Sequence, residues 1–558
     1  MQRSSRLPHI AALTLLTLAV AACGGGGGGG SSLTPPFSGG GSTSSSSSSS
    51  SASSSSTGWV SGLFQAASTF ANKCQTPRTG VDSEGNAFPD TAGTSLDEKN
   101  WLRSWTHETY LWNTEVVDTD PALGGTPVDY FNTLKTNAIT ASGKAKDQFH
   151  FSEPTADTLA RADSAAEAGY GADFVILAGS PPRDVRVAYT EPGSPAEDVV
   201  DGHAKLVRGS QILTADGIDV VNGASTQAQV DALNAALFPD TAGVTTTLVV
   251  RDPGASATRT VTLTSADIAE SPVNRTRVLD DGAGHKTGYI LFNTFSPYAS
   301  EKALSDAMQG MKDQGVGDLV IDLRYNGGGL LAVASELGYM VAGDARTSGR
   351  TFDKLRFNAA AGNLDPVTGE VNEPVPFYNT GVGFSVADGT ALPTLNLGRV
   401  FVLTTDNTCS ASEAVINGLR GVGVDVIQVG GKTCGKPYGF YPQDNCGTTY
   451  YSIQFQGTND AGFGDFADGF EPQDASDPIG VKIDGCSASD DYDHDLGDAG
   501  EGMLSTALSY ASTGTCPAAA HASTARLARG VTATGTGPEL VKPVRSVMDD
   551  NLDMRLRP

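Results

Sequence analysis

The sequence predicts an α/β domain with a mixed sheet and flanking helices, preceded by a small α+β domain and an N-terminal helical region. Two observations carry this prediction. From residue 271 to 515, strand-like and helix-like segments alternate, which is typical of a partly parallel sheet covered by helices. From residue 166 to 270 the apolar segments are short and separated by turns, whereas helical periodicity dominates residues 58–165.

Length and charge limit the possible functions. The chain has 558 residues, with 63 Asp and Glu against 37 Lys and Arg, which gives a net charge of −26. Nucleic acids and anionic lipid surfaces both require a cationic face, so this balance excludes them as partners. The length is enough for about two to four domains.

The N-terminus has the features of an export signal. Arg3 and Arg6 precede an apolar run over residues 10–22 that ends in Val-Ala-Ala before Cys23. Charge and length fit a secretory signal peptide, and the small residues before the cysteine resemble a bacterial lipoprotein lipobox. This resemblance implies that residues 1–23 are the signal and that Cys23 is lipidated. A plain signal peptide with a chance cysteine is the alternative.

A Gly/Ser-rich segment follows at residues 24–57. Such a segment is a flexible coil that can hold a folded body away from a membrane. Gly24, rather than Asp, follows the cysteine. By resemblance to Gram-negative lipoproteins, this residue predicts a lipid anchor on the periplasmic face of the outer membrane, and the membrane is a partner only through that anchor.

The other cysteines also indicate export. Six remain after Cys23, and an even number in an exported chain predicts disulfides without choosing among the fifteen pairings. A zinc site is the competing interpretation, and it lacks a Cys-x-x-Cys pair or a nearby His pair. The six are Cys74, Cys409, Cys434, Cys446, Cys486 and Cys516.

The helical region begins with an amphipathic segment from Ser95 to Trp112. Three of the four tryptophans of the chain lie here, which favours a helical cap over a cofactor site. The region after it, residues 166–270, has predicted strands at 185–189, 245–251 and 260–264 and a predicted helix at 227–237.

Two motifs of residues 166–270 resemble the interior signature of a PDZ domain. These are Gly-Ser-Pro-Ala at 193–196 and Leu-Val-x-Gly-x-x-Ile-Leu at 206–213. The resemblance implies that residues 169–174 are a loop whose N–H groups hold the C-terminal carboxylate of a peptide. The adjacent sheet edge would accept that peptide as an added strand. The residues assigned to peptide binding are Gly169, Tyr170, Gly171 and Ala172.

The α/β region contains most of the strand and helix signals. Strands are predicted at 287–292, 319–323, 400–404, 424–429 and 448–456, and helices at 300–314, 412–419 and 502–510. The tail, residues 516–558, is polar and weakly patterned, which predicts a peripheral or disordered segment.

Three motifs of this region could support catalysis. Residues 322–329 read Asp-Leu-Arg-Tyr-Asn-Gly-Gly-Gly, and glycines after a buried strand let backbone N–H groups approach an oxyanion closely. A flexible strand-to-helix turn is the alternative. Residues 408–413 read Thr-Cys-Ser-Ala-Ser-Glu, and Ser410 there lies at a predicted helix N-terminus, where a capping box with Glu413 is equally compatible.

The third motif, residues 433–440, reads Thr-Cys-Gly-Lys-Pro-Tyr-Gly-Phe. Residues 430–436 also fit the nucleotide-binding pattern Gly-x-x-x-x-Gly-Lys, but Pro437 stands where that loop needs Ser or Thr. A phosphate-binding loop is therefore excluded.

Taken together, the three motifs resemble the C-terminal processing peptidases, also called tail-specific proteases. The resemblance covers about residues 169–498 and includes the upstream PDZ-like domain. It implies that Ser410 is the nucleophile, that Lys436 is the general base, and that the N–H groups of Gly328 and Ala411 form the oxyanion hole. The chemistry agrees, because serine needs a base and a lysine can be that base only where burial favours its neutral form.

Two features depart from the family pattern. Ser410 and Lys436 are 26 residues apart, one more than the usual spacing. Phe440 replaces a glutamine that orients the lysine in bacterial relatives, and Gln443, Gln454 or a tyrosine could substitute. Cys409 could pair with Cys434, while a pair between Cys434 and Cys446 is equally open.

The acidic run at residues 490–495 does not fit an EF-hand, because Leu496 and Gly502 occupy the positions that require Gly and Glu when counted from Asp491. We expect a solvated loop before a helix at 502–510, with no metal and no cofactor.

The sequence thus predicts a serine endopeptidase that cleaves unstructured or tail regions of exported proteins through a Ser-Lys dyad. Its partners would be protein or peptide substrates, and the sequence does not indicate an oligomeric state. A catalytically silent peptide-binding scaffold with the same fold is the alternative. An esterase fits less well, because the chain lacks Gly-x-Ser-x-Gly and the Ser…Asp…His order.

Replacing Cys23 tests the anchor. Cys23→Ser removes the thiol that would carry the lipid, so we expect the full-length protein to lose its lipid mass and to leave the membrane fraction. Intact mass spectrometry and detergent-phase partitioning measure both effects. Unchanged mass and unchanged partitioning would contradict the lipoprotein prediction.

Overall fold

The structure is a computed structural model that describes residues 59–82, 85–164, 166–517 and 538–542. The predicted signal peptide with Cys23, the predicted tether and most of the predicted tail lie outside the described residues. Within the described ranges, no helix combines the length and the apolar character needed to cross a bilayer.

Over residues 59–82 and 85–164, the N-terminal region has three α-helices, which occupy only part of the stretch with helical periodicity. Thr94 caps the first helix, since its hydroxyl accepts a hydrogen bond from the Asp97 N–H at 3.2 Å. Trp101 and Trp105 of this helix are buried and stacked. The elements are η1 (Ala67–Thr69), β1 (Lys73–Cys74), β2 (Thr91–Ala92), α1 (Ser95–Thr109), η2 (Asn113–Glu115), α2 (Pro127–Phe131), β3 (Phe151–Pro154) and α3 (Thr155–Ser164).

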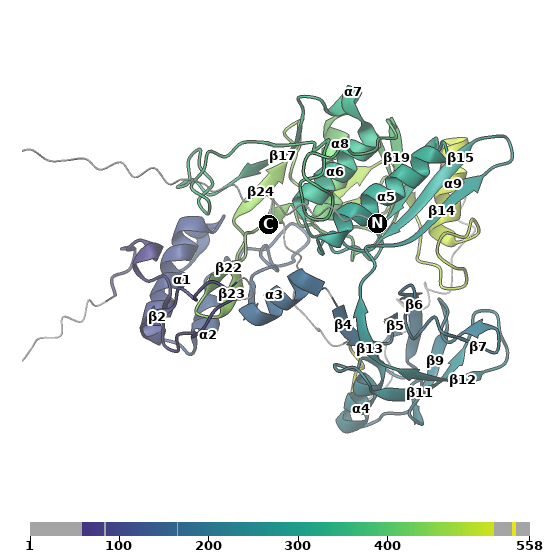
Figure 1. Ribbon diagram of the computed structural model, residues 1–558, viewed down its shortest axis with the longest axis horizontal. Helices are drawn as coiled ribbons and strands as arrows, with labels where there is room; N and C mark the ends of the chain where they lie inside the picture. The colour runs from purple at the N-terminus through teal and green to yellow at the C-terminus, as the bar shows by residue number, and fades with distance from the viewer. Residues whose placement is uncertain (1–58, 83–84, 165, 518–537, 543–558) are drawn as a thin grey trace, which may run out of the picture. The chain divides into compact units, whose positions relative to one another are not determined.

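Residues 166–270 form a domain around one antiparallel sheet, which we call the β domain (Figure 1). Its main sheet has the order β12-β11-β9-β6-β5, so β5 is an edge strand. Helix α4 buries Val230, Leu233 and Leu237 in the core of this domain. The elements are β4 (Ala166–Gly169), β5 (Ala172–Ala178), β6 (Asp184–Thr190), β7 (Val199–Val200), β8 (His203–Ala204), β9 (Gln211–Ala215), β10 (Ile218–Asp219), α4 (Gln227–Leu237), β11 (Thr245–Arg251), β12 (Arg259–Thr264) and β13 (Ala266–Ala269).

Residues 271–515 contain the predicted α/β domain, whose mixed sheet has the order β14-β15-β16-β19-β20-β27. Strand β14 is antiparallel to β15, and the other neighbours are parallel. The sheet strands are β14 (Val273–Asp280), β15 (Lys286–Phe292), β16 (Asp318–Asp322), β19 (Arg399–Thr404), β20 (Asp425–Gly430) and β27 (Gly485–Ser487). The helices are α5 (Ala299–Asp313), α6 (Leu331–Ala342), α7 (Asp344–Thr347), α8 (Ala411–Gly421) and α9 (Gly502–Thr513).

Alternate residues of these strands point to two separate cores. Ile290 and Ile321 pack in one core with α5, α6 and α8, whereas Tyr289 and Val320 pack in the other with α9. The sheet therefore lies between two helical layers, as the alternating pattern predicts. The smaller sheets use β17 (Thr351–Arg356), β18 (Val375–Pro376), β21 (Tyr438–Gly439), β22 (Gln443–Asn445), β23 (Thr448–Tyr451), β24 (Phe455–Thr458), β25 (Phe470–Pro472) and β26 (Val481–Ile483).

The six cysteines after Cys23 all form disulfides, which confirms the prediction made from their even number. Cys409 pairs with Cys434, one of the two pairings left open by the sequence. The other two bridges are Cys74–Cys446 and Cys486–Cys516.

The acidic run is only in part the solvated loop that we expected, because residues 493–495 are exposed whereas Asp490 and Asp491 are not. Arg208 and Arg324 both form ion pairs with Asp490, at 2.5 Å each. Arg324 is fully buried and also pairs with Asp322 and Glu501, at 2.8 Å each. The two guanidinium groups hold the pKa of Asp490 well below its usual range, in spite of its burial. Sequence spacing could not show this, because the cationic partners come from distant parts of the chain.

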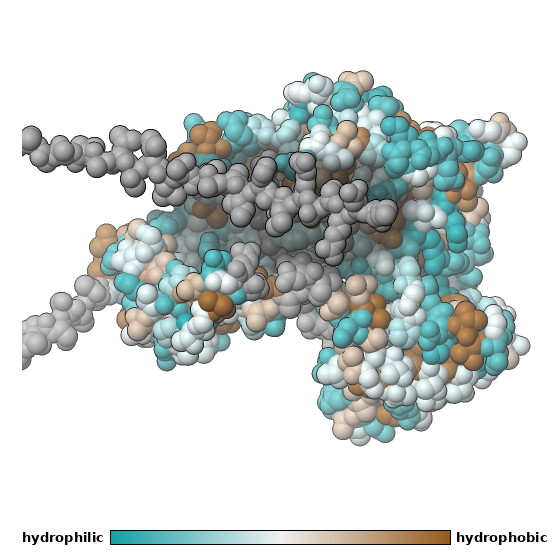
Figure 2. All heavy atoms as spheres, viewed as in Figure 1, coloured by the Kyte–Doolittle hydropathy of each residue, from teal (hydrophilic) through white to brown (hydrophobic). Residues whose placement is uncertain are grey.

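The surface in the view of Figure 2 is mostly hydrophilic. An apolar patch lies over β7 in the β domain, where Val199 is 70% exposed and Val200 is 53% exposed. These two residues belong to a short hairpin formed by β7 and β8.

Two buried carboxyl groups meet between α5 and α6. Glu301 accepts hydrogen bonds from the N–H groups of Val382 and Val386 at 2.8 and 2.5 Å, and Glu336 accepts one from Val382 at 3.1 Å. Burial, the charge of Glu301 and a hydrogen bond to Glu301 raise the pKa of Glu336 to about 9. Glu336 is therefore protonated at neutral pH and can donate to Glu301.

This pair predicts a specific pH dependence of stability. The ordinary pKa of Glu336 is 4.5 and its folded-state pKa is about 9, so between these values the folded state holds the extra proton. The free energy of unfolding then falls as pH rises, by about 1.4 kcal/mol per pH unit for one proton. Glu336→Gln keeps a donor toward Glu301 without titrating, so we expect it to flatten the curve and to stabilise the protein at pH 8 to 9.

Urea unfolding of the parent and of Glu336→Gln at several pH values measures this difference. Glu370→Gln, at an exposed position, is the control and should follow the parent. If the free energy of unfolding of the parent and of Glu336→Gln changed with pH in the same way, Glu336 would not be the group that titrates.

Candidate active site

Three loops meet at the carboxyl edge of the main sheet. Strands β16, β19 and β20 are parallel neighbours that end at Asp322, Thr404 and Gly430. Each strand is followed by one of the three motifs, at residues 322–329, 408–413 and 433–440. Ligand sites of α/β sheets form at this edge, because the loops after parallel strands converge there.

Ser410 occupies a strained turn between β19 and α8. Its backbone has φ 56° and ψ −114°, a region that residues other than glycine seldom adopt. The residue is 1% exposed, and its hydroxyl has no hydrogen-bond partner among the described residues. A serine on a sharp strand-to-helix turn is the usual position of an activated nucleophile.

Lys436 lies beside Ser410 in the folded chain. Both residues line one small cavity of about 10 Å³. Lys436 is 1% exposed, and its Nζ lies 4.8 Å from the ring centre of Phe149 and 4.5 Å from that of Phe440. Phe440, which stands where bacterial relatives have a glutamine, thus contacts Lys436 through its aromatic ring.

Glu413 links the two loops through both of its carboxylate oxygens. Oε2 accepts hydrogen bonds from the N–H groups of Ser410 at 3.1 Å and Lys436 at 2.7 Å. Oε1 accepts from the Gly435 N–H at 2.9 Å and from the Thr433 hydroxyl at 2.5 Å. Burial raises the pKa of Glu413, and these hydrogen bonds oppose that rise. The sequence showed Glu413 only as a capping residue, because its partners on the other loop are distant in the chain.

The disulfide between Cys409 and Cys434 joins the same two loops, next to Ser410 and close to Lys436. Cys409, Glu413 and Cys434 are also the only group of three metal-ligand side chains within the described parts of the chain. Because both sulfur atoms are in the disulfide, this group does not fit a metal ion.

The two predicted oxyanion donors are neighbours. A Cβ placed on Gly328 would lie 3.0 Å from the Ala411 backbone nitrogen and 2.8 Å from the Ser410 Cβ, so only glycine permits this approach. Ala411 is the first residue of α8, where an N–H has no acceptor within the helix. The Gly328 N–H, however, donates to Asn326 Oδ1 at 2.9 Å. One of the two donors is therefore already engaged.

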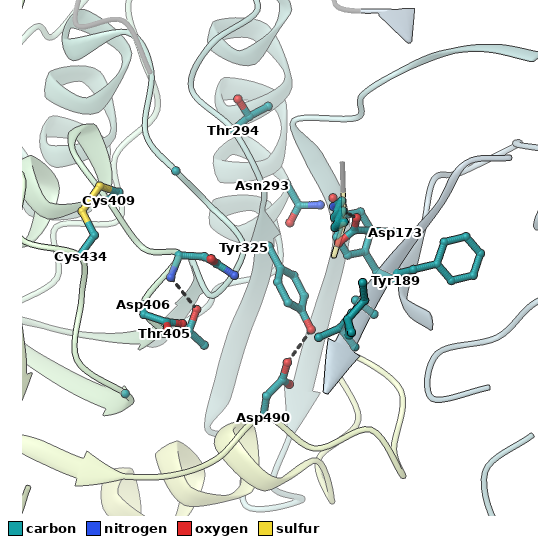
Figure 3. Close-up of a pocket in the computed structure, with 18 of the residues that line it drawn as sticks. Asp173, Tyr189, Asn293, Thr294, Tyr325, Thr405, Asp406, Cys409, Cys434 and Asp490 are labelled. Atoms are coloured by element: carbon teal, nitrogen blue, oxygen red, sulfur yellow. Dashed lines mark hydrogen bonds and ion pairs between the residues drawn. A yellow bond between two sulfur atoms is a disulfide. The ribbon is translucent and has the colours of Figure 1, made fainter. Parts of the chain in front are cut away.

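A cleft of about 1990 Å³ connects this edge of the sheet with the β domain. Figure 3 shows the disulfide on one side of the pocket, Asp173 and Tyr189 on the other, and Tyr325 between them. The Tyr325 hydroxyl donates to Asp490 at 2.7 Å and accepts from Arg208 at 2.7 Å. The β domain thereby contacts the glycine loop directly.

The residues predicted to bind peptide line the same cleft: Gly169, Tyr170, Gly171 and Ala172. Strand β5 already begins at Ala172, so the loop is shorter than the predicted stretch 169–174. The Tyr170 side chain is buried and its hydroxyl donates to the Ala236 carbonyl at 3.0 Å. Tyr170 thus supports the loop through the core.

Asp353 was not recognised from the sequence, and it lines the small cavity with Ser410 and Lys436. Its carboxylate faces Gly457: a Cβ placed on Gly457 would lie 2.3 Å from Asp353 Oδ2. Burial raises the pKa of Asp353 to about 7. No local motif marks this residue, since it comes from β17 and not from any of the three loops.

Of the two glutamines that could replace the family glutamine, Gln443 belongs to β22 and Gln454 lies in the connection between β23 and β24. Gln454 is fully buried, and its Oε1 accepts from the Tyr441 N–H at 2.7 Å. Its Nε2 has no hydrogen-bond partner among the described residues. Gln443 is half-buried in β22.

Comparison with known proteins gives a family match over the segment that contains the three motifs. Residues 286–440 match the model of peptidase family S41. This segment is therefore similar to an S41 peptidase domain. It includes Gly328, Ser410 and Lys436 and ends at Phe440.

The similar proteins carry related names. The chain is 38% identical over 146 residues to a carboxyl-terminal-processing protease of Picosynechococcus, covering 26% of this chain and 32% of that protein. It is 32% identical over 192 residues to a chloroplastic C-terminal processing peptidase of Tetradesmus obliquus, covering 33% and 39%. The chain thus spans only about a third of the length of these curated relatives.

One solved structure, an S41 protease of Bacteroides fragilis, covers 74% of this chain and 97% of its own. The TM-score is 0.56 and the identity is 22%. This similarity supports the mixed α/β fold outside the S41 domain as well.

The strain at Ser410 can be measured by substitution. Ser410→Gly removes the Cβ that makes positive φ unfavourable, whereas Ser410→Ala keeps it. We expect Ser410→Gly to be more stable than Ser410→Ala by about 1 kcal/mol, even though glycine is the more flexible residue when unfolded. Calorimetry of both variants measures the difference. If Ser410→Gly were less stable than Ser410→Ala, the backbone at position 410 would not be strained.

Proposed function

We propose that this protein is a serine endopeptidase that hydrolyses unstructured or tail regions of exported proteins, with Ser410 as nucleophile and Lys436 as general base. The observation that supports this function best is the cavity shared by both side chains at a strained turn. Cleavage of tails is an inference from the S41 domain and from the sequence motifs. The anchor at Cys23 and the periplasmic location rest on the sequence motif alone.

In the proposed reaction, neutral Lys436 accepts the proton of the Ser410 hydroxyl as Oγ bonds to the substrate carbonyl carbon. The oxyanion receives the Ala411 N–H at the positive end of α8. Gly328 becomes the second donor when its N–H leaves Asn326. The Lys436 ammonium then protonates the departing amine, and water hydrolyses the acyl-enzyme by the same route.

The surroundings of Lys436 favour this role. Phe149 and Phe440 cover its Nζ, and Pro437 lines the same cavity. These groups exclude water from the amine, and desolvation favours the neutral form of a lysine. Glu413 fixes the backbone of both members of the dyad. The serine and the lysine are therefore positioned relative to each other before substrate binds.

We propose in addition that the β domain is PDZ-like and presents peptides along the edge of β5. The cleft that joins this edge to the disulfide beside Ser410 supports a continuous path for an extended chain. Main-chain hydrogen bonds to an edge strand bind many sequences, which suits a protein that acts on varied tails.

Substitution of the dyad tests the catalytic proposal. Ser410→Ala and Lys436→Ala should each reduce cleavage of an unfolded model protein by at least about 10³-fold, and the double variant should be no worse, because the two act as one unit. Lys436→Arg should be equally inactive, since guanidinium stays charged. The rate of the parent should rise with pH as the Lys436 amine loses its proton.

Cleavage assays from pH 6 to 9, in roughly the range where tuned lysines titrate, and fluorophosphonate labelling measure these effects. Lys432→Ala, on an amine that pairs with Asp477 at 2.7 Å, is the control and should remain active. Absence of both hydrolysis and labelling in the parent would favour the silent scaffold. Cleavage retained by Lys436→Ala would show that another group is the base.

A further inference from the structure

A short segment of the C-terminal tail lies on the β domain. Leu540 is 1% exposed and belongs to the hydrophobic core of that domain. Its N–H donates to the Gly179 carbonyl at 2.9 Å, directly after the end of β5. A residue of the tail is thus packed as a core residue of a domain about 300 positions earlier in the chain.

Two polar contacts hold this segment on either side of Leu540. The buried Arg183 guanidinium donates to the Pro538 carbonyl at 2.8 Å. The same guanidinium also donates to the Gly179 carbonyl at 2.9 Å and to the Gly223 carbonyl at 2.7 Å. Arg183 therefore links the tail segment to the residue after β5 and to the loop before α4. On the other side, the Lys542 ammonium pairs with Asp173 of β5 at 2.5 Å.

The positions of these contacts give the segment a direction. Leu540 pairs near the end of β5 and Lys542 near its start, so the segment runs antiparallel to β5. Leu540 is buried whereas Val541 is 58% exposed, which is the alternation of an added strand. Because β5 is the edge of the sheet, it has unpaired backbone groups for such a strand.

Gly179 permits the close approach. A Cβ at this position would lie 2.7 Å from the Leu540 carbonyl oxygen and 2.9 Å from the Glu539 Cγ. Any other residue here would push the segment away from the strand. The surface is therefore shaped for a peptide backbone.

We propose that the β domain holds a binding site for an internal, extended peptide segment and that residues 538–542 of the same chain are its resident occupant. The site takes an aliphatic side chain at the position of Leu540 and a cation two residues later, opposite Asp173. It needs no terminal carboxylate. A peptide of this type from another protein must displace the chain's own segment. The proposal extends the peptide-binding role proposed for the β domain and does not depend on hydrolysis by Ser410.

Competition with a synthetic peptide tests the site. The probe is a fluorescein-labelled peptide with the sequence of residues 535–545, and the protein is the full chain with Ser410→Ala, so that the peptide is not cleaved. Leu540→Asp should release the chain's own segment and tighten peptide binding by more than about 10-fold, because a charge replaces a buried aliphatic group. Val541→Asp, at the exposed neighbour, is the matched control and should bind like the parent.

Fluorescence anisotropy gives the dissociation constants. Equal affinity for the parent, Leu540→Asp and Val541→Asp, or no binding to any of them, would overturn the proposal. The Gly179→Ala variant should lose peptide binding in the Leu540→Asp background, because its Cβ meets the peptide backbone. Retained binding in that variant would place the peptide elsewhere and would also overturn the proposal.

Hydrogen–deuterium exchange tests the resident segment without changing the core. The Leu540 N–H should be protected in the parent. Lys542→Glu should reduce that protection by about 3-fold, as expected for a partly exposed ion pair. The double variant Asp173→Lys with Lys542→Glu should restore it. A Leu540 N–H that exchanges like an unstructured peptide in the parent would overturn the proposal even where peptidase activity is normal.

Discussion

The arrangement of the candidate site depends on one buried carboxylate, that of Glu413. Its two oxygens receive four hydrogen bonds, from Ser410, Thr433, Gly435 and Lys436. Burial raises the pKa of Glu413, and the four donors oppose that rise because together they match the acceptor capacity of the ionised form. The carboxylate thus holds the turn of the serine and the loop of the lysine in one geometry. The Cys409–Cys434 disulfide joins the same loops covalently, which limits how far they can separate.

A second buried charge cluster connects the glycine loop to the β domain. Arg324 lies two residues before Asn326, whose amide holds the Gly328 N–H. Arg324 and Arg208 share Asp490, and Arg208 belongs to the β domain. Removing one partner of a buried cluster leaves an uncompensated charge, which costs more than the pair contributes. The position of the β domain and the conformation of the glycine loop are therefore coupled through the same three charges.

The sequence predicts local elements well and contacts between distant segments poorly. Helix 227–237 and strand 245–251 have the predicted bounds, because their periodicity and turn residues are local signals. Helix α6 was not predicted, since all of its residues are buried and it has no polar face. The three motifs pointed to Ser410 and Lys436. The position of Asp353 and the hydrogen bonds of Glu413 with Thr433, Gly435 and Lys436 could not be predicted, because they depend on which strands become neighbours. The partners of Asp490 are unpredictable for the same reason.

The occupied β5 edge and the buried serine are separate constraints on the same cleft. Lys542 and Cys409 both line it, yet Leu540 is fixed by apolar burial whereas Ser410 is fixed by backbone geometry and by Glu413. A peptide that bound along β5 as proposed would have to replace residues 538–542, whose local concentration is high because they belong to the same chain. If the β domain binds peptides as proposed, binding in the cleft would be selective for peptides that fill the Leu540 position and also pair with Asp173. Under the two proposals, this selection would take place at β5 and would precede any reaction of the peptide at Ser410.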